Sequence, residues 1–326
     1  MSHRLGFAVK VLGDGSLASH DTRRWQSGPH LRVSLERLRA IFDYLERVDV
    51  RMYRMASNLV PYGSHPDMPQ FHGQVEKCAE ELAALGERAR GADLRLSFHP
   101  GQYVVLNSEI PDLQRSAARD LELHASVLDA MEVGSDAVVV LHVGGAGGGK
   151  GAAMDRFMAG FELLSEQAKA RLVIENDDNR FGLADILALS SRTGLRVVWD
   201  ALHHRCYDPD RIPVDEALRL ALGTWNAGVV PKIHYSSPRT TVEERRRRRG
   251  RRVERRIVLP PLRTHADLID PFGFEQFLGG PAAGLEFDVM LEAKAKDLAL
   301  IRLREQLQEH EFDWDRGHLT RLEVQL

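Results

Sequence analysis

Cysteine is scarce in this sequence, since Cys78 and Cys206 are the only two among 326 residues. Two cysteines cannot form the disulfide framework on which small secreted domains depend. Long apolar runs are missing as well, and none approaches the roughly 18 to 20 residues that cross a membrane. The start, MSHRLGFAVK, is too short and too polar for a signal peptide. We therefore expect a cytoplasmic protein in a reducing compartment, without a membrane partner.

Charge of one sign does not dominate the chain, whose formal net charge is −3. The exception is residues 243–256, where nine Arg and three Glu give +6, so the rest of the chain carries −9. An anionic partner must therefore meet local positive patches, because the overall field does not attract it. The basic segment would contact phosphates if it lay along DNA, but the pattern fits equally a solvated mobile loop or a charged helix in which Glu243 and Glu244 pair with arginines.

Hydrophobic residues make up 43% of the chain and include four Trp and 12 Phe. This is enough to form a sizeable core. Short apolar runs alternate eight times with segments of helical periodicity. The expected strands are at 5–12, 50–55, 94–98, 137–141, 172–174, from 196, 228–233 and 284–288. The expected helices are at 31–48, 74–90, 111–131, 153–169, 183–193, up to about 222, 268–278 and from 291 onward.

Eight alternations of strand and helix in a chain of this length are typical of an α/β fold, the (β/α)8 TIM barrel, with its active site at the C-terminal ends of the strands. A doubly wound open sheet is the alternative. The barrel explains the sequence better, because all its strands open onto one mouth. We expect a single domain over residues 1–326, with a basic insertion at about 240–260 and a helical C-terminal tail from about 291.

Ligand-type side chains stand where the apolar runs end. Because the C-terminal ends of parallel strands lie on one rim, these residues should converge. Six of the 14 histidines fall at strand ends or in the loops that follow, and three carboxylates accompany them. The nine residues are His65, His99, His142, Glu175, Asp200, His203, His234, His265 and Glu292. Imidazole and carboxylate suit Zn, Mn or Fe(II), and nine ligands are too many for one ion, so we expect a cluster of two or three metals.

Other interpretations of these residues remain open. Asp200 could be the N-cap of a following helix, and ENDDN at 175–179 could be a turn. Lys232 points to the same face as His234, where an ammonium would repel cations, so it could be a neutral amine, a phosphate contact, a modified residue or a lysine that snorkels to the rim. Seven further histidines are expected to be solvated or to make ordinary hydrogen bonds: His3, His20, His30, His72, His124, His310 and His318.

HPGQY at 99–103 joins a ligand-type residue to an amide and an aromatic ring. An aromatic ring on an exposed loop can stack on a base or fill a vacated place in a duplex. Gln102 and Tyr103 are therefore candidates for nucleic-acid contact.

The order of these blocks resembles the UV damage endonuclease family. VPYGSHP, SFHPGQY, LHVGG, VIENDD, WDALHH, PKIHYSS, the THAD around His265 and DVMLEAKAKD match its successive motifs from about residue 5 to 300. The basic segment near 240–260 is outside the shared pattern. The resemblance implies a TIM barrel with a divalent metal cluster, commonly Mn²⁺ with Zn²⁺ or Mg²⁺ as alternatives. It also implies a nick immediately 5′ of UV photoproducts, namely cyclobutane pyrimidine dimers and 6-4 photoproducts, that starts excision repair.

Carried over residue by residue, the resemblance makes the nine residues above the metal ligands and Lys232 a carboxylated, metal-associated lysine. Lys232, Glu175 and His203 are then expected to carry catalysis. Gln102 and Tyr103 match the pair that probes the lesion. Phe7 and Lys10 stand where the family often has Tyr and Asn, so Phe7 is expected to stack on DNA and Lys10 to contact phosphate.

The expected partner is double-stranded DNA with UV lesions, in a bacterial-type, nucleoid-associated setting and with no obligatory protein partner. Rival interpretations are an abasic-site endonuclease of the endonuclease IV type or a sugar isomerase on the same barrel, and a damage-binding protein that cuts nothing. A further one is an RNA-binding protein that depends on the arginine run. Incision of defined duplexes separates the nucleases and the binding protein.

Overall fold

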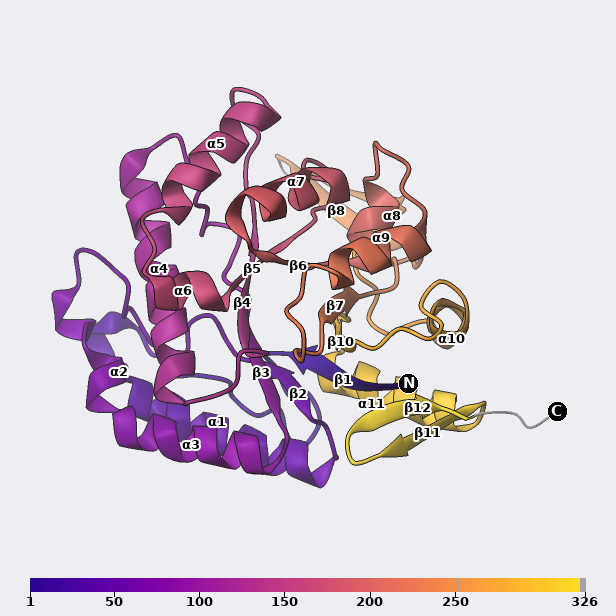
Figure 1. Cartoon of the computed structure of the whole chain (residues 1–326), viewed down its shortest axis with the longest axis horizontal. Helices are drawn as coiled ribbons and strands as arrows, with labels where there is room; N and C mark the ends of the chain where they lie inside the picture. Colours follow the sequence, from indigo (N-terminus) through magenta and orange to yellow (C-terminus); the bar gives the residue numbers. More distant parts are fainter. Residues whose placement is uncertain (251, 323–326) are drawn as a thin grey trace.

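The computed structural model of the chain describes residues 1–250 and 252–322. Eight parallel strands form a closed barrel, and most of the helices lie outside it (Figure 1). The barrel strands are β1 (Ser2–Ala8), β2 (Met52–Arg54), β3 (Arg95–Phe98), β4 (Val138–His142), β5 (Leu172–Glu175), β6 (Arg196–Val198), β7 (Lys232–Tyr235) and β10 (Asp288–Leu291).

The barrel closes at the junction of β6 and β7. Strands β1 to β6 pair in sequence order, and β10 pairs with both β1 and β7. Just beyond β6, Asp200 forms a parallel bridge with His234 of β7, and the His234 amide donates to the Trp199 carbonyl at 3.0 Å. The predicted (β/α)8 barrel is confirmed, and the open doubly wound sheet is excluded.

Apolar periodicity accounts for the helices outside the barrel. In α1 (Leu31–Arg47), the residues Leu31, Leu35, Leu38 and Leu45 are buried at helical spacing. The His30 ring accepts from the Arg32 amide and caps this helix. The other helices are α2 (Gln74–Lys77), α3 (Ala79–Gly91), α4 (Pro111–Ala130), α5 (Lys150–Phe161), α6 (Glu166–Arg171), α7 (Leu183–Thr193), α8 (Ala201–Cys206), α9 (Val214–Leu222), α10 (Pro271–Gly279) and α11 (Lys296–Gln308), with 3₁₀ turns at Trp25–Ser27 and Pro69–Phe71. Among the residues that the structure describes, none of the helices is both long and apolar enough to span a bilayer.

Strands β1 and β7 have boundaries that differ from the predicted ones. Strand β1 ends at Ala8 instead of reaching Leu12, because Val9 adopts a left-handed conformation with φ 65°. Strand β7 begins at Lys232 instead of Gly228, which has φ 82° and belongs to a turn. Apolar composition alone does not reveal where the backbone leaves the extended conformation.

The predicted C-terminal region also needs correction. Strand β10 begins at Asp288, after a turn at Gly284 with φ 75°, and not at Gly284 itself. The helix expected from about 291 is α11, which begins at Lys296 because Leu291 still belongs to β10, and it ends at Gln308 instead of filling the tail. After α11, the strands β11 (Phe312–Asp315) and β12 (His318–Arg321) form a hairpin that pairs with the start of β1.

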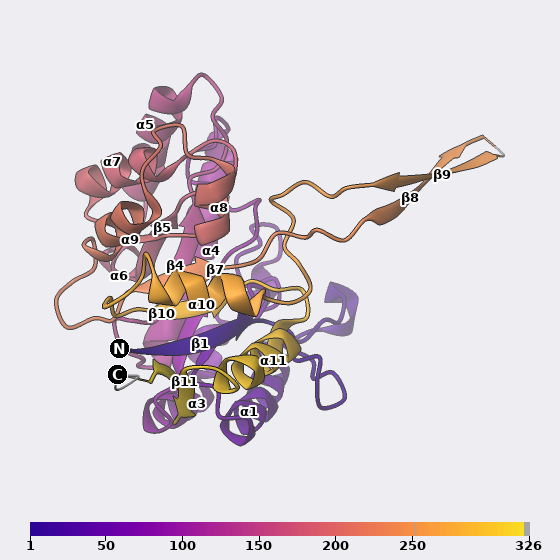
Figure 2. The same cartoon turned by 90° about the vertical axis from the view of Figure 1, so that its right-hand side faces the viewer.

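The basic segment forms neither a helix nor an irregular loop. Strands β8 (Glu243–Arg249) and β9 (Arg252–Val258) form a two-stranded antiparallel hairpin that projects away from the barrel (Figure 2). Position 251, which belongs to this segment, lies outside the described residues. The hairpin extends on the side toward which β1 runs, which is the C-terminal end of the barrel strands.

An ionic network fills the barrel interior near the N-terminal ends of the strands. The Asp288 Oδ2 atom accepts from Arg95 Nη1 at 2.8 Å and from Arg4 Nη1 at 3.0 Å. Arg95 and Arg196 also lie against the ring of Trp225, at 5.5 and 4.9 Å from its centroid. Burial disfavours the Asp288 carboxylate, but Arg95 and Arg4 outweigh burial and hold its pKa below the ordinary value.

Replacing Asp288 with Ala should destabilise the barrel strongly. The change leaves the buried guanidinium of Arg95 without its partner, and breaking a buried pair costs about 3 to 5 kcal/mol. The free energy of unfolding in urea at pH 7 should fall by about that amount. Because the pKa of Asp288 is lowered in the folded protein, its contribution is present at neutral pH and is lost as the pH falls through the acid range.

Asp215→Ala is the matched control, since Asp215 pairs with Arg219 on the exposed face of α9 at 2.9 Å. It should leave the unfolding curve almost unchanged. Equal effects of the two substitutions would contradict the role of the interior network.

Candidate metal centre at the barrel mouth

Glu175 is the centre of a cluster of imidazoles. It ends β5 and is fully buried. Its Oε2 atom lies 2.9 Å from His99 Nε2 and 3.4 Å from His142 Nε2. Its Oε1 atom lies 2.7 Å from His234 Nδ1 and 3.6 Å from His203 Nδ1. One carboxylate therefore contacts or approaches four histidines that come from four different strand ends.

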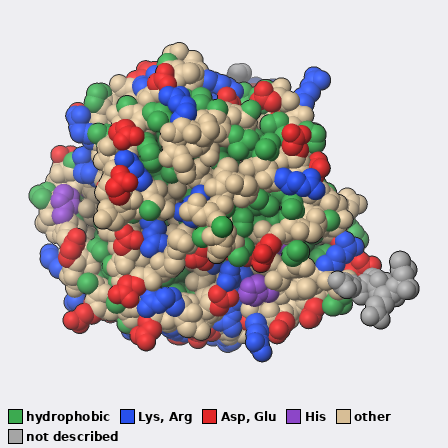
Figure 3. All heavy atoms as spheres, in the orientation of Figure 1, with side chains coloured by type: hydrophobic (Ala, Val, Ile, Leu, Met, Phe, Trp, Pro, Cys, Tyr) green, Lys and Arg blue, Asp and Glu red, His purple; other side chains and the backbone are tan. Residues whose placement is uncertain are grey.

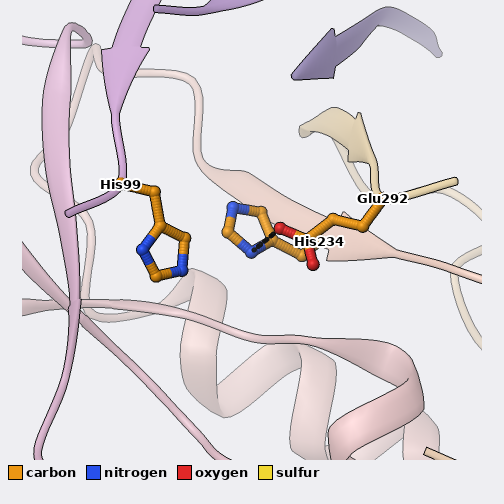
Figure 4. Close-up of side chains that lie close together, drawn as sticks. All are labelled: His99, His234 and Glu292. Atoms are coloured by element: carbon orange, nitrogen blue, oxygen red, sulfur yellow. Dashed lines mark ion pairs between the residues drawn. The ribbon is translucent and has the colours of Figure 1, made fainter. Parts of the chain in front are cut away.

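A second carboxylate, Glu292, extends the cluster. It follows β10, and its Oε1 atom lies 3.4 Å from His234 Nδ1, as Figure 4 shows with His99 nearby. Its Oε2 atom lies 3.7 Å from His265 Nδ1, and Arg54 at the end of β2 donates to Oε1. His234 therefore lies between the two carboxylates and links them.

Asp200 has two roles at once. Its Oδ1 atom accepts from the His203 amide at 2.7 Å, so it is the N-cap of α8, as one interpretation of the sequence held. Its Oδ2 atom is buried without a hydrogen-bond partner among the described residues. The same carboxylate thus orients His203 and keeps one oxygen free for a ligand.

Strand register explains why these residues meet. His142 pairs with Glu175 across β4 and β5, and the bridge between Asp200 and His234 closes the barrel. Each of these residues is at or just beyond the end of a strand, where the barrel opens. The predicted convergence of strand-end residues is therefore what the structure shows for this group.

Electrostatics in the cluster reflect burial and close charges. Burial lowers the pKa of His234 to about 4, and Glu175 and Glu292 offset this only in part. Burial raises the pKa of Asp200 to about 7. At His203 burial is outweighed by Asp200 and Glu175, which raise its pKa to about 9. A neutral imidazole such as that of His234 is the form that binds a metal ion.

Three groups of side chains have ligand atoms close enough together to hold a cation. They are His99 with His234 and Glu292, His99 with His142 and Glu175, and Glu175 with Asp200 and His203. The donor types suit a divalent transition metal. The buried atoms Asp200 Oδ2 and His142 Nδ1 have no hydrogen-bond partner among the described residues, and a bound cation would satisfy such atoms. The residues fit a metal site.

Lys232 is fully buried, and its Nζ atom has no hydrogen-bond partner among the described residues. Burial, with Arg54 and Arg95 adding to it, lowers its pKa well below that of an ordinary lysine. The interpretation of Lys232 as a side chain that snorkels to the rim is therefore wrong, because the amine has no access to water. A neutral amine is the form that this environment favours.

His65 lies apart from the cluster. It is half-buried in the long loop after β2, and its Nδ1 atom accepts from the Asp67 amide at 3.2 Å. It lines a cavity of about 580 Å³ together with His20 and Ser57. Within the described part of the chain, no ion pair joins it to the other eight predicted ligands.

The residues predicted to contact DNA divide into two kinds. Gln102, Tyr103 and Lys10 are exposed, and 86% of Tyr103 is accessible. Phe7 is fully buried in β1 and packs edge-on against Tyr53, with ring centroids 5.5 Å apart. The expectation that Phe7 stacks on DNA is therefore wrong, because its side chain faces the core.

Two functional neighbours were not predicted from the sequence. Arg54 pairs with Glu292, and Asn176 holds both Asp200 and His203 through its side chain and its carbonyl. The Asn176 Oδ1 atom accepts from the Asp200 amide at 2.8 Å, and its carbonyl lies 3.0 Å from His203 Nδ1. Arg54 and Asn176 are polar residues at strand ends, like the predicted ligands. Arginine and asparagine are not typical ligands of transition metals, so a search for such ligands does not find them.

Comparison with solved structures first defines the class of fold. The crystal structure of 3-keto-D-glucoside 4-epimerase, YcjR, from E. coli is similar with a TM-score of 0.56 at 11% identity, covering 94% of this chain and 100% of that chain. At this identity the likeness shows the fold alone, that of a (β/α)8 barrel.

Closer similarities define the family. The family model described as UV-endonuclease UvdE matches residues 30–316. The UV DNA damage endonuclease of Bacillus pumilus (strain SAFR-032) is 33% identical over 261 residues, covering 79% of this chain and 75% of the relative. The crystal structure of SacUVDE has a TM-score of 0.79 at 29% identity, covering 94% of this chain and 98% of that one. The chain belongs to the UV-endonuclease UvdE family, a family of DNA repair nucleases.

Replacing Glu175 with Gln should remove the stabilisation that a bound cation gives. Gln keeps the shape but loses the charge that the four imidazoles approach. After chelation and dialysis, adding Mn²⁺ at about 100 times its dissociation constant should stabilise the native chain by about 2.7 kcal/mol for each site that is filled. The shift in melting temperature should be absent or much smaller in the variant.

The matched control is Glu166→Gln on the exposed first turn of α6, which should keep the full Mn²⁺ shift. An unaltered shift in Glu175→Gln would place the cation somewhere other than this cluster.

Proposed function

We propose that the chain hydrolyses the DNA phosphodiester immediately 5′ of UV photoproducts, in a metal-dependent reaction that initiates excision repair. The substrates are duplexes with cyclobutane pyrimidine dimers or 6-4 photoproducts. The observation that carries the proposal is a buried cluster of histidines and carboxylates at the barrel mouth in a chain of the UV endonuclease family. A DNA substrate implies that the protein acts beside the chromosome, in the bacterial cytoplasm.

The metal centre of this proposal uses eight residues of the described cluster, with His65 as a ninth ligand after movement of its loop. We favour two or three Mn²⁺ ions, with Zn²⁺ or Mg²⁺ as alternatives, because three carboxylates accompany the five imidazoles of the cluster. Divalent cations held there would polarise the phosphate, lower the pKa of an attacking water and stabilise the leaving 3′-oxygen. The cluster ligands are His99, His142, Glu175, Asp200, His203, His234, His265 and Glu292.

Glu175, His203 and Lys232 have the central roles among the side chains. Glu175 orients the imidazoles around it, and Asp200 and Asn176 orient His203. The neutral amine of Lys232 is poised to add CO₂ and lose a proton, which gives an anionic carbamate. The carbamate would place an anionic group that binds cations where the neutral amine carries no charge.

Gln102 and Tyr103 recognise the lesion in this proposal. They lie in the exposed loop that follows His99, so a duplex bound at the mouth meets them first. Dimerised bases cost less to unstack than intact ones, which gives selectivity without reading of sequence. Tyr103 can then fill the space that the displaced bases leave, and Lys10 can contact a phosphate at the same rim.

Incision of defined duplexes tests the proposal. With Mn²⁺, the chain should nick a labelled duplex immediately 5′ of a single cyclobutane pyrimidine dimer and leave an undamaged duplex intact. EDTA should stop the reaction, and Glu175→Gln should lower the rate by at least about 100-fold, because the central carboxylate is lost. Gel analysis of the end-labelled strand gives both the position and the rate of cutting.

The other outcomes identify the rivals. Cutting at an abasic site but not at the dimer would overturn the proposal in favour of an abasic-site endonuclease. Tight binding of the dimer duplex without any cutting, by folded and Mn²⁺-loaded protein, would overturn it in favour of a damage-binding protein.

A further inference from the structure

The β8–β9 hairpin concentrates positive charge on an element that the barrel does not need. Residues 243–258 contain nine Arg and three Glu, in a chain whose net charge is −3. The hairpin contributes nothing to the barrel sheet, since β8 and β9 pair only with each other among the described strands. By contrast, acidic and basic side chains are intermixed on the molecular face of Figure 3, from which the hairpin points away.

Arginines oppose each other across the two strands. Arg245 pairs in register with Arg256, and Arg246 with Arg255. Like charges directly opposite each other destabilise a hairpin, and an isolated two-stranded hairpin is at best marginally stable in water. This pattern reduces stability when the hairpin is alone and becomes favourable when an anion lies against it.

The glutamates of the hairpin neutralise only some of its arginines. Glu244 pairs with Arg246 at 2.9 Å and lies 3.7 Å from Arg255, while Glu243 lies 3.7 Å from Arg245. Three exposed arginines have no carboxylate within 4.0 Å among the described residues: Arg248, Arg252 and Arg256. These three are available to a partner without breaking an ion pair.

The base of the hairpin is fixed to the candidate metal centre. Pro238 forms an antiparallel bridge with His265, whose ring faces Glu292. The Arg239 amide donates to the Thr264 carbonyl at 2.7 Å. Arg263 lies 3.6 Å from Asp178, in the loop that follows Glu175. The base of the hairpin therefore lies beside the candidate metal ligands.

The dimensions of the hairpin fit duplex DNA. Its strands have seven residues each, about 24 Å at about 3.4 Å per residue. A duplex of that length carries about 14 phosphate charges, at one per about 1.7 Å of axis. The major groove of B-DNA is about 12 Å wide and admits a two-stranded ribbon, whereas the minor groove, at about 6 Å, is too narrow.

Edge pairing with a second copy of the chain is disfavoured, although Val253 and Ile257 are 56% and 78% exposed. Two hairpins side by side would bring two sets of arginines together, which repel each other. The positive charge of the hairpin complements a polyanion and does not complement a second hairpin.

We propose that the β8–β9 hairpin is a second DNA-binding element, which lies in the major groove of the duplex beside the incision site and contacts phosphates through its arginines. This inference rests on the proposed function, since it takes the substrate of the mouth to be duplex DNA. It assigns the hairpin to affinity and placement on undamaged flanking DNA, while Gln102 and Tyr103 recognise the lesion.

The test compares two triple variants of the full chain by fluorescence anisotropy, as a function of salt concentration and in EDTA, so that no cutting occurs. The variant R248Q/R252Q/R256Q removes three phosphate contacts, and the slope of log K against log salt should decrease in magnitude by about 2.7. The loss should be the same for damaged and undamaged duplexes. The matched variant R248K/R252K/R256K keeps the charges and should keep the slope, and all three proteins should melt at the same temperature.

An unchanged slope in the glutamine variant would overturn the inference, and so would a loss confined to the damaged duplex. A-form RNA has a major groove too deep and narrow for a ribbon. An equal change in slope on duplex RNA would therefore replace the major-groove assignment with general polyanion binding. Because these readouts are binding constants, failure here is distinct from failure of the incision assay.

Discussion

The buried carboxylate of Glu175 is the interaction on which the functional end of the barrel depends. A carboxylate without access to water is costly unless cations or donors compensate it. Here four imidazoles do so, and each comes from a different strand end. The closure of the barrel through Asp200 and His234 fixes two members of the same cluster, so the fold and the site share one set of contacts. Lys232 Nζ and Asp200 Oδ2 show where this compensation is incomplete among the described residues.

The residues that stabilise the barrel and those of the candidate site lie at opposite ends of its strands. Near the N-terminal ends of the strands, Asp288 is fully paired with Arg95 and Arg4. Near the C-terminal ends, charged groups are left short of partners, as is common where a site awaits a ligand. Arg54, the last residue of β2, belongs to this end and pairs with Glu292.

The sequence predicted the barrel and most of its site because both follow from one local rule, an apolar run that ends in a ligand-type residue. It did not predict positions that depend on backbone conformation, such as Val9, whose left-handed φ ends β1 early. Phe7 was assigned to DNA through the family resemblance, which gives a position in the chain but not the direction of its side chain, and in β1 this side chain faces the core. Arg54 was not predicted because its contacts with His234 and Glu292 join residues 180 and 238 positions away in the sequence. The sequence did not predict the conformation of residues 243–258, because an arginine run has no apolar periodicity that indicates a strand or a helix.

Anomalous diffraction from crystals grown with Mn²⁺ tests the central claim, that the strand-end cluster is a metal centre with more than one ion. The account predicts at least two peaks near the manganese edge, each within coordination distance of ligand atoms from the Glu175 cluster. It also predicts density for a carbamate on Lys232. A single peak away from Glu175, or none in crystals of folded protein, would contradict it.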